Sequence, residues 1–275
     1  MLSQPRVCAV SYLNTAPLVW GLLHGPQKGL VDLHFALPSE CAERLRTADA
    51  DVGLPPSIEL AAQPNLVVIP GCSISSRGEA GSVLLVTGKP IEELETVAAD
   101  TSSRSSVALA QIVLARKYHR HVKMRPYPPR IEEMLDIADA AVIIGDPALR
   151  FKSPAGVRPC RVYDLGLEWY DLTGLPMVFA VWVARDAAVD PGLGSVLAAS
   201  AQYGLARLEQ IAEAEGPRRG LSRARALDYL SRQLQYSWGE PESRGLSLFL
   251  EYAAELGLAP SRATWQTLLE PTLVP

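Results

Sequence analysis

The chain of 275 residues is 48% hydrophobic and 20% charged, and its formal net charge is −4. This balance is typical of a globular protein with a sizeable core, and the length favours two α/β lobes. The weakly acidic charge argues against a nucleic-acid-binding surface, and no run of about eighteen apolar residues suggests a membrane span. The N-terminal segment lacks the apolar core of a secretory signal, so we expect a cytoplasmic protein.

Ten short apolar runs predict β-strands at residues 6–13, 31–37, 51–55, 66–71, 82–88, 96–100, 123–127, 140–145, 160–165 and 177–184. Helical spacing between these runs predicts helices at residues 17–24, 39–48, 103–118 and 130–136. Beyond about residue 190 the strands stop, and helical spacing extends over residues 192–215, 222–235 and 242–256. The alternation favours an α/β architecture with mostly parallel sheets and a helical C-terminal region.

The order of the elements predicts two lobes joined by two crossovers. The first lobe takes residues 1–88 and 179–275, including the C-terminal helices, and residues 89–178 form an inserted second lobe. Gly and Pro at residues 88–90 and 173–176 indicate the crossovers, because both residue types end regular elements. Ligands of such folds bind between the lobes, at strand C-termini and helix N-termini.

Polar residues follow several predicted strands at the point where a helix is expected to begin. They are Asn14 and Thr15, Ser57, Thr101 with Ser102 and Ser103, and Gly145 with Asp146, while Ser82 ends a hydroxyl-rich loop at residues 72–82. Each position alone is explained by helix capping, for which Ser, Thr, Asn and Asp are the usual residues. Taken together, they indicate a cleft in which helix N-termini and hydroxyl donors bind a small carboxylate.

Other chemistries find less support in the sequence. The phosphate motifs GxxxxGK[ST] and GxGxxG and the GxSxG motif of hydrolases are absent. The four cysteines are scattered, and His119 and His121 lack neighbouring carboxylates or thiols, so we expect no metal site. Arg77 and Arg104 are either charged partners of the carboxylate or solvated loop residues. From the residues alone, the prediction is a two-lobed binder of an organic acid.

Six segments form an ordered set of motifs: SYLNTAPL (11–18), DVGLPPSIE (51–59), SISSRGEAGSVLLVT (73–87), DTSSRSSVALAQIVL (100–114), AAVIIGDPAL (140–149) and YDLGLEWYDLTGLPMVFAVW (163–182). Together they resemble the chorismate dehydratases of the futalosine route to menaquinone, over residues 6 to about 184. The resemblance implies a two-lobed type 2 periplasmic-binding-protein-like fold. It also implies a hydro-lyase, a carbon-oxygen lyase that converts chorismate to 3-[(1-carboxyvinyl)oxy]benzoate and water without a cofactor.

The resemblance assigns the polar residues to the two carboxylates of chorismate. Asn14 and Ser82 are the catalytic candidates, which fix the enolpyruvyl carboxylate while that group accepts the ring proton. The rival hypothesis makes Asp146 or Glu59 the base. The substrate-binding candidates are Thr15, Ser57, Thr101, Ser102, Ser103, Gly145 and Asp146, of which the adjacent serines hold the ring carboxylate.

Alternative interpretations stay open at this point. The sister enzyme, 1,4-dihydroxy-6-naphthoate synthase, shares the fold, but its N-terminal motif is Cys-rich where this chain has Asn14 and Thr15. A non-catalytic carboxylate-binding protein would also share the fold, although such receptors carry a signal peptide. A ligand-sensing effector domain would need an attached DNA-binding segment. The amphipathic C-terminal helices either form a homodimer face or pack on the first lobe.

Overall fold

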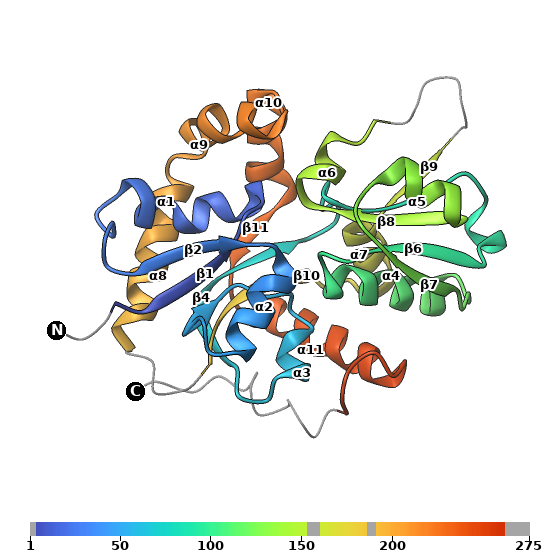
Figure 1. Ribbon diagram of the computed structural model, residues 1–275, viewed down its shortest axis with the longest axis horizontal. Helices are drawn as coiled ribbons and strands as arrows, with labels where there is room; N and C mark the ends of the chain where they lie inside the picture. The colour runs from blue at the N-terminus through green and yellow to red at the C-terminus, as the bar shows by residue number, and fades with distance from the viewer. Residues whose placement is uncertain (1–3, 153–159, 186–190, 262–275) are drawn as a thin grey trace.

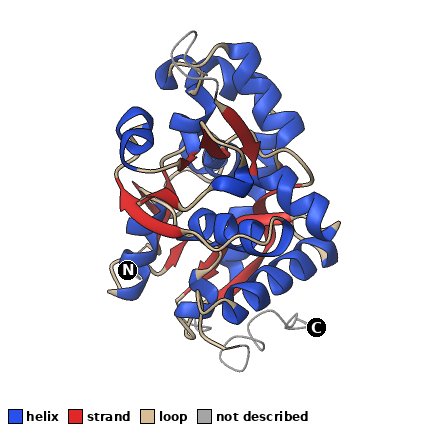
Figure 2. Cartoon of the chain, turned by 90° about the vertical axis from the view of Figure 1, so that its right-hand side faces the viewer, coloured by secondary structure: helices blue, strands red, loops and turns tan. Residues whose placement is uncertain are grey.

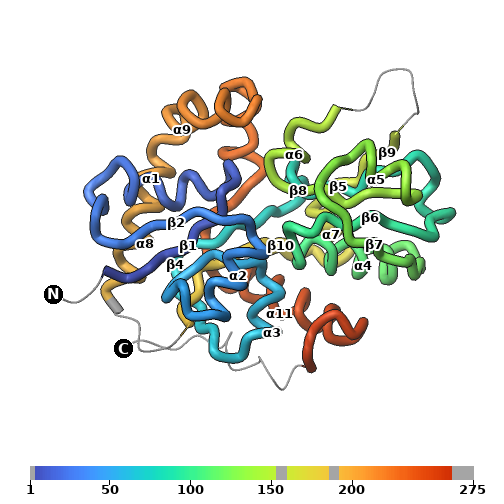
Figure 3. Tube along the Cα trace, viewed as in Figure 1, coloured from blue at the N-terminus to red at the C-terminus, as the bar shows by residue number. Residues whose placement is uncertain are grey.

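The computed structural model describes residues 4–152, 160–185 and 191–261 (Figure 1). Within these residues the strands form two sheets, with the orders β11-β4-β10-β3-β1-β2 and β7-β6-β8-β5-β9. We call the parts of the chain built on these sheets the first lobe and the second lobe. In Figure 3 the N-terminal and C-terminal segments, blue and orange, share the first lobe, and the green central segment forms the second.

The first-lobe strands are β1 (Arg6–Val10), β2 (Asp32–Ala36), β3 (Val52–Gly53), β4 (Val67–Ser76), β10 (Met177–Ala184) and β11 (Gln235–Ser237). Its helices are α1 (Ala16–His24), α2 (Pro38–Arg46), α3 (Glu59–Ala62), α8 (Pro191–Leu205), α9 (Leu208–Glu215), α10 (Arg223–Asp228) and α11 (Glu240–Glu255), with 3₁₀ turns η1 (Leu13–Thr15) and η3 (Pro217–Arg219) and a π-helical turn η4 (Tyr229–Gln233).

The second-lobe strands are β5 (Val83–Thr87), β6 (Thr96–Asp100), β7 (Lys123–Tyr127), β8 (Ala140–Ile144) and β9 (Arg161–Asp164). Its helices are α4 (Arg104–Lys117), α5 (Ile131–Ile137), α6 (Gly145–Arg150) and α7 (Leu165–Thr173), with a 3₁₀ turn η2 (Ile91–Glu93).

Helices cover both sheets, as Figure 2 shows. The last four residues of β1 are buried, which is expected of a parallel strand covered on both faces. On the first lobe α1 packs against α8, and Ser200 of α8 donates a hydrogen bond to the Leu18 carbonyl of α1 at 2.8 Å. The C-terminal helices α8 and α9 therefore pack on the first lobe, one of the two uses expected from the sequence.

Both sheets are mixed, so the prediction of mostly parallel sheets was wrong. Strands β1, β2 and β3 are parallel, and so are β6, β7 and β8. However, β5 runs antiparallel to β8 and β9, and β10 runs antiparallel to β3 and β4. Each of these two strands enters its sheet directly from a crossover, at the end where the parallel strands finish, and therefore runs in the opposite direction.

The strand pairing also places the first crossover earlier than the sequence analysis expected. Strand β5 was assigned to the first lobe, which was expected to end at position 88, but it pairs with β8 and β9 in the second sheet. The chain therefore passes between the sheets at residues 77–82. It returns between the end of α7 and the start of β10, where Gly174 adopts a φ of 69° and ends the helix.

A strand was missed in the C-terminal region, where only helices were expected. Strand β11 pairs antiparallel with β4, and β4 itself continues through residues that were predicted as a loop. Ser73 and Ser75 of β4 donate to the carbonyl groups of Ser237 and Gln235, at 2.7 Å and 3.2 Å. Hydroxyl residues in this strand are thus satisfied by the neighbouring backbone, and a three-residue strand is too short to show a periodic pattern.

Helix α11 packs against both β10 of the first lobe and α4 of the second. Trp169 of α7 is fully buried beside Phe249 of α11, and its indole N–H donates to the Pro176 carbonyl at 3.2 Å. This apolar contact stabilises the side of the molecule that carries the crossovers. Among the described residues, none of the helices combines the length and the hydropathy needed to cross a membrane.

Candidate active site

A pocket lies between the lobes and takes residues from both. Its polar lining consists of Tyr12, Asn14, Ser82, Ser103, Ser106 and the Gly145 backbone. The rest of its lining is apolar and includes Phe179, which the sequence analysis did not single out as a site residue. None of the described residues that line the pocket has a charged side chain. The pocket therefore offers hydroxyl and amide groups inside an apolar wall, at the carboxyl ends of β1 and β8.

Asn14 reaches the pocket from η1, the short turn that connects β1 to α1. The Thr15 hydroxyl donates to the Asn14 side-chain oxygen at 3.3 Å. Because that oxygen is occupied, the amide N–H groups of Asn14 are the atoms free to face a ligand. Thr15 itself is fully buried, does not line the pocket and makes no side-chain cap on α1, so it supports Asn14.

Ser82 lies at the start of β5 and is buried. Its carbonyl accepts the Gly145 N–H at 2.8 Å, and its hydroxyl oxygen accepts the Tyr229 hydroxyl at 2.8 Å. These two bonds fix both the backbone and the side chain of Ser82 at the pocket wall. Sequence reasoning missed Tyr229, because 147 residues separate it from Ser82 and no local pattern connects them.

The N-terminus of α4 contributes two serines. Ser103 is the N-cap residue, its hydroxyl accepts the Ser106 N–H at 3.3 Å, and the two hydroxyls lie 3.1 Å apart. Both residues line the pocket. Ser106 belongs to the hydroxyl-rich motif read from the sequence, and its position three residues after the cap is the signal that could have identified it.

Several other predicted residues have partners outside the pocket. The Ser102 amide and hydroxyl donate to Asp100 at 2.8 Å and 2.6 Å, so Asp100 braces this loop. Ser57 shares a hydrogen bond with Ser105 at 3.2 Å. Thr101 is exposed to solvent, and only its backbone N–H is bonded, to the Tyr127 carbonyl. The structure therefore brings Asn14, Ser82, Ser103 and Gly145 together at the pocket and leaves Thr15, Ser57, Thr101 and Ser102 behind its wall.

Asp146 also lies outside the pocket lining, where it connects the two lobes. One carboxylate oxygen accepts the Leu13 N–H at 3.0 Å, and the other lies 3.1 Å from Arg219 Nε. Burial raises the pKa of Asp146, while the Leu13 N–H and the guanidinium of Arg219 act in the opposite direction. Both oxygens are occupied, so this carboxylate has a structural role across the cleft.

Glu59 is similarly occupied. Its side chain is buried, and its two oxygens bond Arg104 and Gln63, each at 2.9 Å. Arg104 uses its charge on Glu59, and Arg77 lies 3.8 Å from Glu242, so neither arginine lines the pocket. The described residues also contain no group of three or more His, Cys, Asp or Glu side chains placed to hold a metal ion.

The two tyrosines at the pocket are neutral hydrogen-bond donors. Burial raises the pKa of Tyr12 to about 12, and its hydroxyl lies 3.2 Å from that of Ser102. Burial also raises the pKa of Tyr229 above its usual value. A pocket with only neutral donors binds an anion through hydrogen bonds, and in an apolar surrounding such bonds to a charged acceptor are strong.

The fold and the pocket define a class of two-lobed binding proteins. The chain is similar to protein AF1704 from Archaeoglobus fulgidus (TM-score 0.75, 15% identity, covering 94% of this chain and 100% of that chain). It is also similar to the periplasmic aliphatic sulphonate-binding protein SsuA from Escherichia coli (TM-score 0.60, 16% identity, 94% and 88%). A third neighbour, the Candida albicans CA3427 product, has the generic periplasmic-binding-protein fold (TM-score 0.64, 12% identity, 98% and 95%). The protein thus has a periplasmic-binding-protein-like fold.

Sequence comparison then gives the family. Residues 5–255 match the family model described as menaquinone biosynthesis. The chain is 32% identical over 270 residues to the chorismate dehydratase of Thermus thermophilus, covering 90% of this chain and 94% of that protein. The chain therefore belongs to the menaquinone biosynthesis family.

Proposed function

We propose that the protein is a chorismate dehydratase, a carbon-oxygen lyase that forms 3-[(1-carboxyvinyl)oxy]benzoate and water in the futalosine route to menaquinone. The observation that carries the proposal is the pairing of Asn14 and Ser82 on one uncharged pocket wall. It is supported by the 32% identity to a chorismate dehydratase. The reaction is redox-neutral, so its stoichiometry requires no redox cofactor.

The chemistry explains why a pocket of neutral donors is sufficient. Removing the ring proton beside the enolpyruvyl ether breaks a C–H bond, and its electron pair delocalises through the ring double bond to the ring carboxylate. Loss of the ring hydroxyl as hydroxide breaks a C–O bond and leaves an aromatic ring. Proton and hydroxide together make one water. The protein therefore has to fix one reactive geometry and stabilise charge that grows on a carboxylate.

The positions of the donors suggest how the substrate lies. Asn14 and Ser82 hold the enolpyruvyl carboxylate, and Ser103, Ser106 and the free backbone N–H groups at the start of α4 hold the ring carboxylate. Ser102 was expected in this second role, but its bonds to Asp100 favour Ser106 in its place. One well-placed donor at a developing anion is typically worth about 3–4 kcal/mol.

The enolpyruvyl carboxylate of the substrate is the proton acceptor in this proposal. Both carboxylates considered as protein bases, Glu59 and Asp146, lie outside the pocket lining with occupied oxygens. We expect Glu59→Gln and Asp146→Asn to keep kcat within about threefold of the parent, whereas Asn14→Ala and Ser82→Ala lower it about a hundredfold. Steady-state kinetics at saturating chorismate measure this, and a thousandfold fall in either amide variant would identify a protein base.

The proposed activity is tested by incubating the purified protein with chorismate and following ring aromatisation by ultraviolet absorbance and proton NMR. A parallel incubation with cyclic dehypoxanthine futalosine tests for the sister activity. Calorimetry with chorismate completes the comparison. Tight binding without aromatisation would make the protein a non-catalytic carboxylate binder and would overturn the proposal.

A further inference from the structure

Tyr229 occupies an unusual place beside the pocket. It begins the π-helical turn η4 after α10 of the first lobe, and its side chain is only 1% exposed. From there its hydroxyl crosses to the second lobe and donates to the Ser82 hydroxyl oxygen at 2.8 Å. It does not line the pocket, so any influence on a ligand acts through Ser82.

The direction of this hydrogen bond decides what Ser82 can do. A serine hydroxyl has one proton and accepts through its oxygen. Because Tyr229 supplies the proton of the shared bond, the proton of Ser82 is free for a different acceptor. A carboxylate oxygen of the ligand is the acceptor that this uncharged pocket would receive.

The neighbourhood of Tyr229 keeps it in the donor role. Burial raises its pKa, and the Ser82 hydroxyl and the Asn14 amide both interact with its hydroxyl. Tyr229 therefore stays protonated at working pH and contacts both catalytic candidates.

The π-helical turn fixes this arrangement at a second point. A Cβ on Gly81, next to Ser82, would clash with the side chain of Gln233 at the end of the turn. Gln233 in turn accepts a hydrogen bond from Arg225 at 2.8 Å. Single π-helical turns interrupt regular helix at a cost and are frequent at functional sites. Here the turn presses the first lobe onto residues 81 and 82 of the second.

We propose that Tyr229 is a positioning residue, which holds the Ser82 hydroxyl with its proton directed into the pocket toward the substrate carboxylate. This inference rests on the proposed function, because it needs the anionic ligand that Ser82 would bind.

The test is a double-mutant cycle with Tyr229→Phe, Ser82→Ala and the combined variant. Tyr229→Phe should lower kcat/KM for chorismate about tenfold, the loss expected for one hydrogen bond that orients a donor. In the Ser82→Ala background the same change should have no further effect. Tyr236→Phe is the matched control, because Tyr236 is equally buried but its hydroxyl has no hydrogen-bond partner among the described residues. It should match the parent.

Product binding separates this inference from the proposed function. Calorimetry with 3-[(1-carboxyvinyl)oxy]benzoate should show about tenfold weaker binding for Tyr229→Phe, again only when Ser82 is present. If the parent binds this dicarboxylate but does not aromatise chorismate, the proposed function fails and the binding cycle still judges Tyr229. Parent-like behaviour of Tyr229→Phe in both assays would overturn the inference. So would a loss that persists in the Ser82→Ala background, because a structural role would predict it.

Discussion

Gly145 is the residue where the backbone of the second lobe comes closest to a side chain of the pocket. Its φ is 61°, and a Cβ at this position would lie 2.7 Å from the ring of Tyr12. A side chain here would be strained by the backbone and would also push Tyr12 into the pocket. We therefore expect Gly145→Ala to lower kcat/KM for chorismate and to destabilise the fold by about 2 kcal/mol.

Gly174→Ala is the matched control for this change. Gly174 has a similar φ of 69°, but nothing lies within 4 Å of an added Cβ. It should therefore cost only the backbone penalty of about 1 kcal/mol and leave the kinetics unchanged. Urea unfolding and steady-state kinetics of both variants make the comparison. Equal effects at the two positions would show that contact with Tyr12 has no part in the site.

The sequence could indicate site residues only where local order places them at a strand end. Asn14, Ser103 and Gly145 follow their strands directly, and Ser82 precedes one, so their positions could be inferred. Which side of the loop each faces depends on partners far away in the chain. Ser102 follows the same strand as Ser103, yet its side chain turns to Asp100, and no sequence pattern distinguishes the two.

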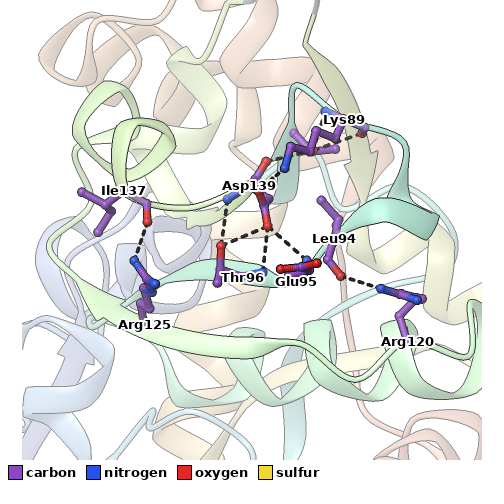
Figure 4. A network of polar contacts seen from close by, with 9 residues as sticks. Lys89, Leu94, Glu95, Thr96, Arg120, Arg125, Ile137 and Asp139 are labelled. Atoms are coloured by element: carbon purple, nitrogen blue, oxygen red, sulfur yellow. Dashed lines mark hydrogen bonds and ion pairs between the residues drawn. The ribbon is translucent and has the colours of Figure 1, made fainter.

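At the scale of elements, Asp139 joins the starts of β6 and β8 in the second lobe (Figure 4). One carboxylate oxygen accepts the N–H groups of Glu95 and Thr96, at 3.1 Å and 3.0 Å, and the other lies 2.5 Å from Lys89 Nζ. Burial raises the pKa of Asp139, but these partners outweigh it and lower the pKa to about 2. The carboxylate is therefore held in its charged form.

This lowered pKa predicts a pH dependence of stability. The contribution is present above the unfolded-state pKa near 3.8 and is lost as the pH falls toward 2, because the unfolded state then binds the proton more readily. We expect Asp139→Asn to lower the free energy of unfolding by about 2 kcal/mol at pH 7. The difference from the parent should narrow between pH 4 and pH 3, as measured by urea unfolding.

Asp136→Asn provides the comparison for this effect. Asp136 lies on α5 and is exposed, so its amide should stay within about 0.5 kcal/mol of the parent. A gap for Asp139→Asn that stays constant with pH would contradict the assigned role, because it would reflect packing and not the charge.

The elements themselves were predictable to different degrees. Strands β6, β7 and β10 begin and end where their apolar runs predicted. The predicted helix at residues 192–215 is divided into α8 and α9, and the pattern gave no sign of the interruption. Strand β11 was missed because its partner β4 lies about 160 residues away, and pairing at that distance leaves no local signal.

At the scale of the whole molecule, the lobes are connected around the pocket by polar contacts. Besides the bond of Tyr229 to Ser82, the Ser39 N–H donates to the Ser102 carbonyl at 3.1 Å. On the opposite side Arg219 of the first lobe pairs with Asp146 of the second. Such contacts favour the arrangement in which the lobes are close together, and they lower the conformational cost of binding a substrate between them.

Arg219 therefore should affect substrate affinity without touching the substrate. Replacing it with Met leaves Asp146 with the Leu13 N–H as its remaining partner, so the closed arrangement is weakened. We expect Arg219→Met to raise KM for chorismate about fivefold with kcat little changed. Small-angle X-ray scattering should show a larger radius of gyration than the parent without ligand and the same value at saturating 3-[(1-carboxyvinyl)oxy]benzoate.

The neighbouring arginine supplies the control for this last prediction. Arg218 is exposed, and its side chain pairs with Glu215 within the first lobe. Arg218→Met removes the same charge and adds the same apolar side chain, but no contact between the lobes is lost. It should keep the KM and the radius of gyration of the parent. If the two variants raised KM equally, net charge would explain the effect. If Arg219→Met lowered kcat at unchanged KM, the ion pair with Asp146 would have a role in the chemical step and not in closing the lobes.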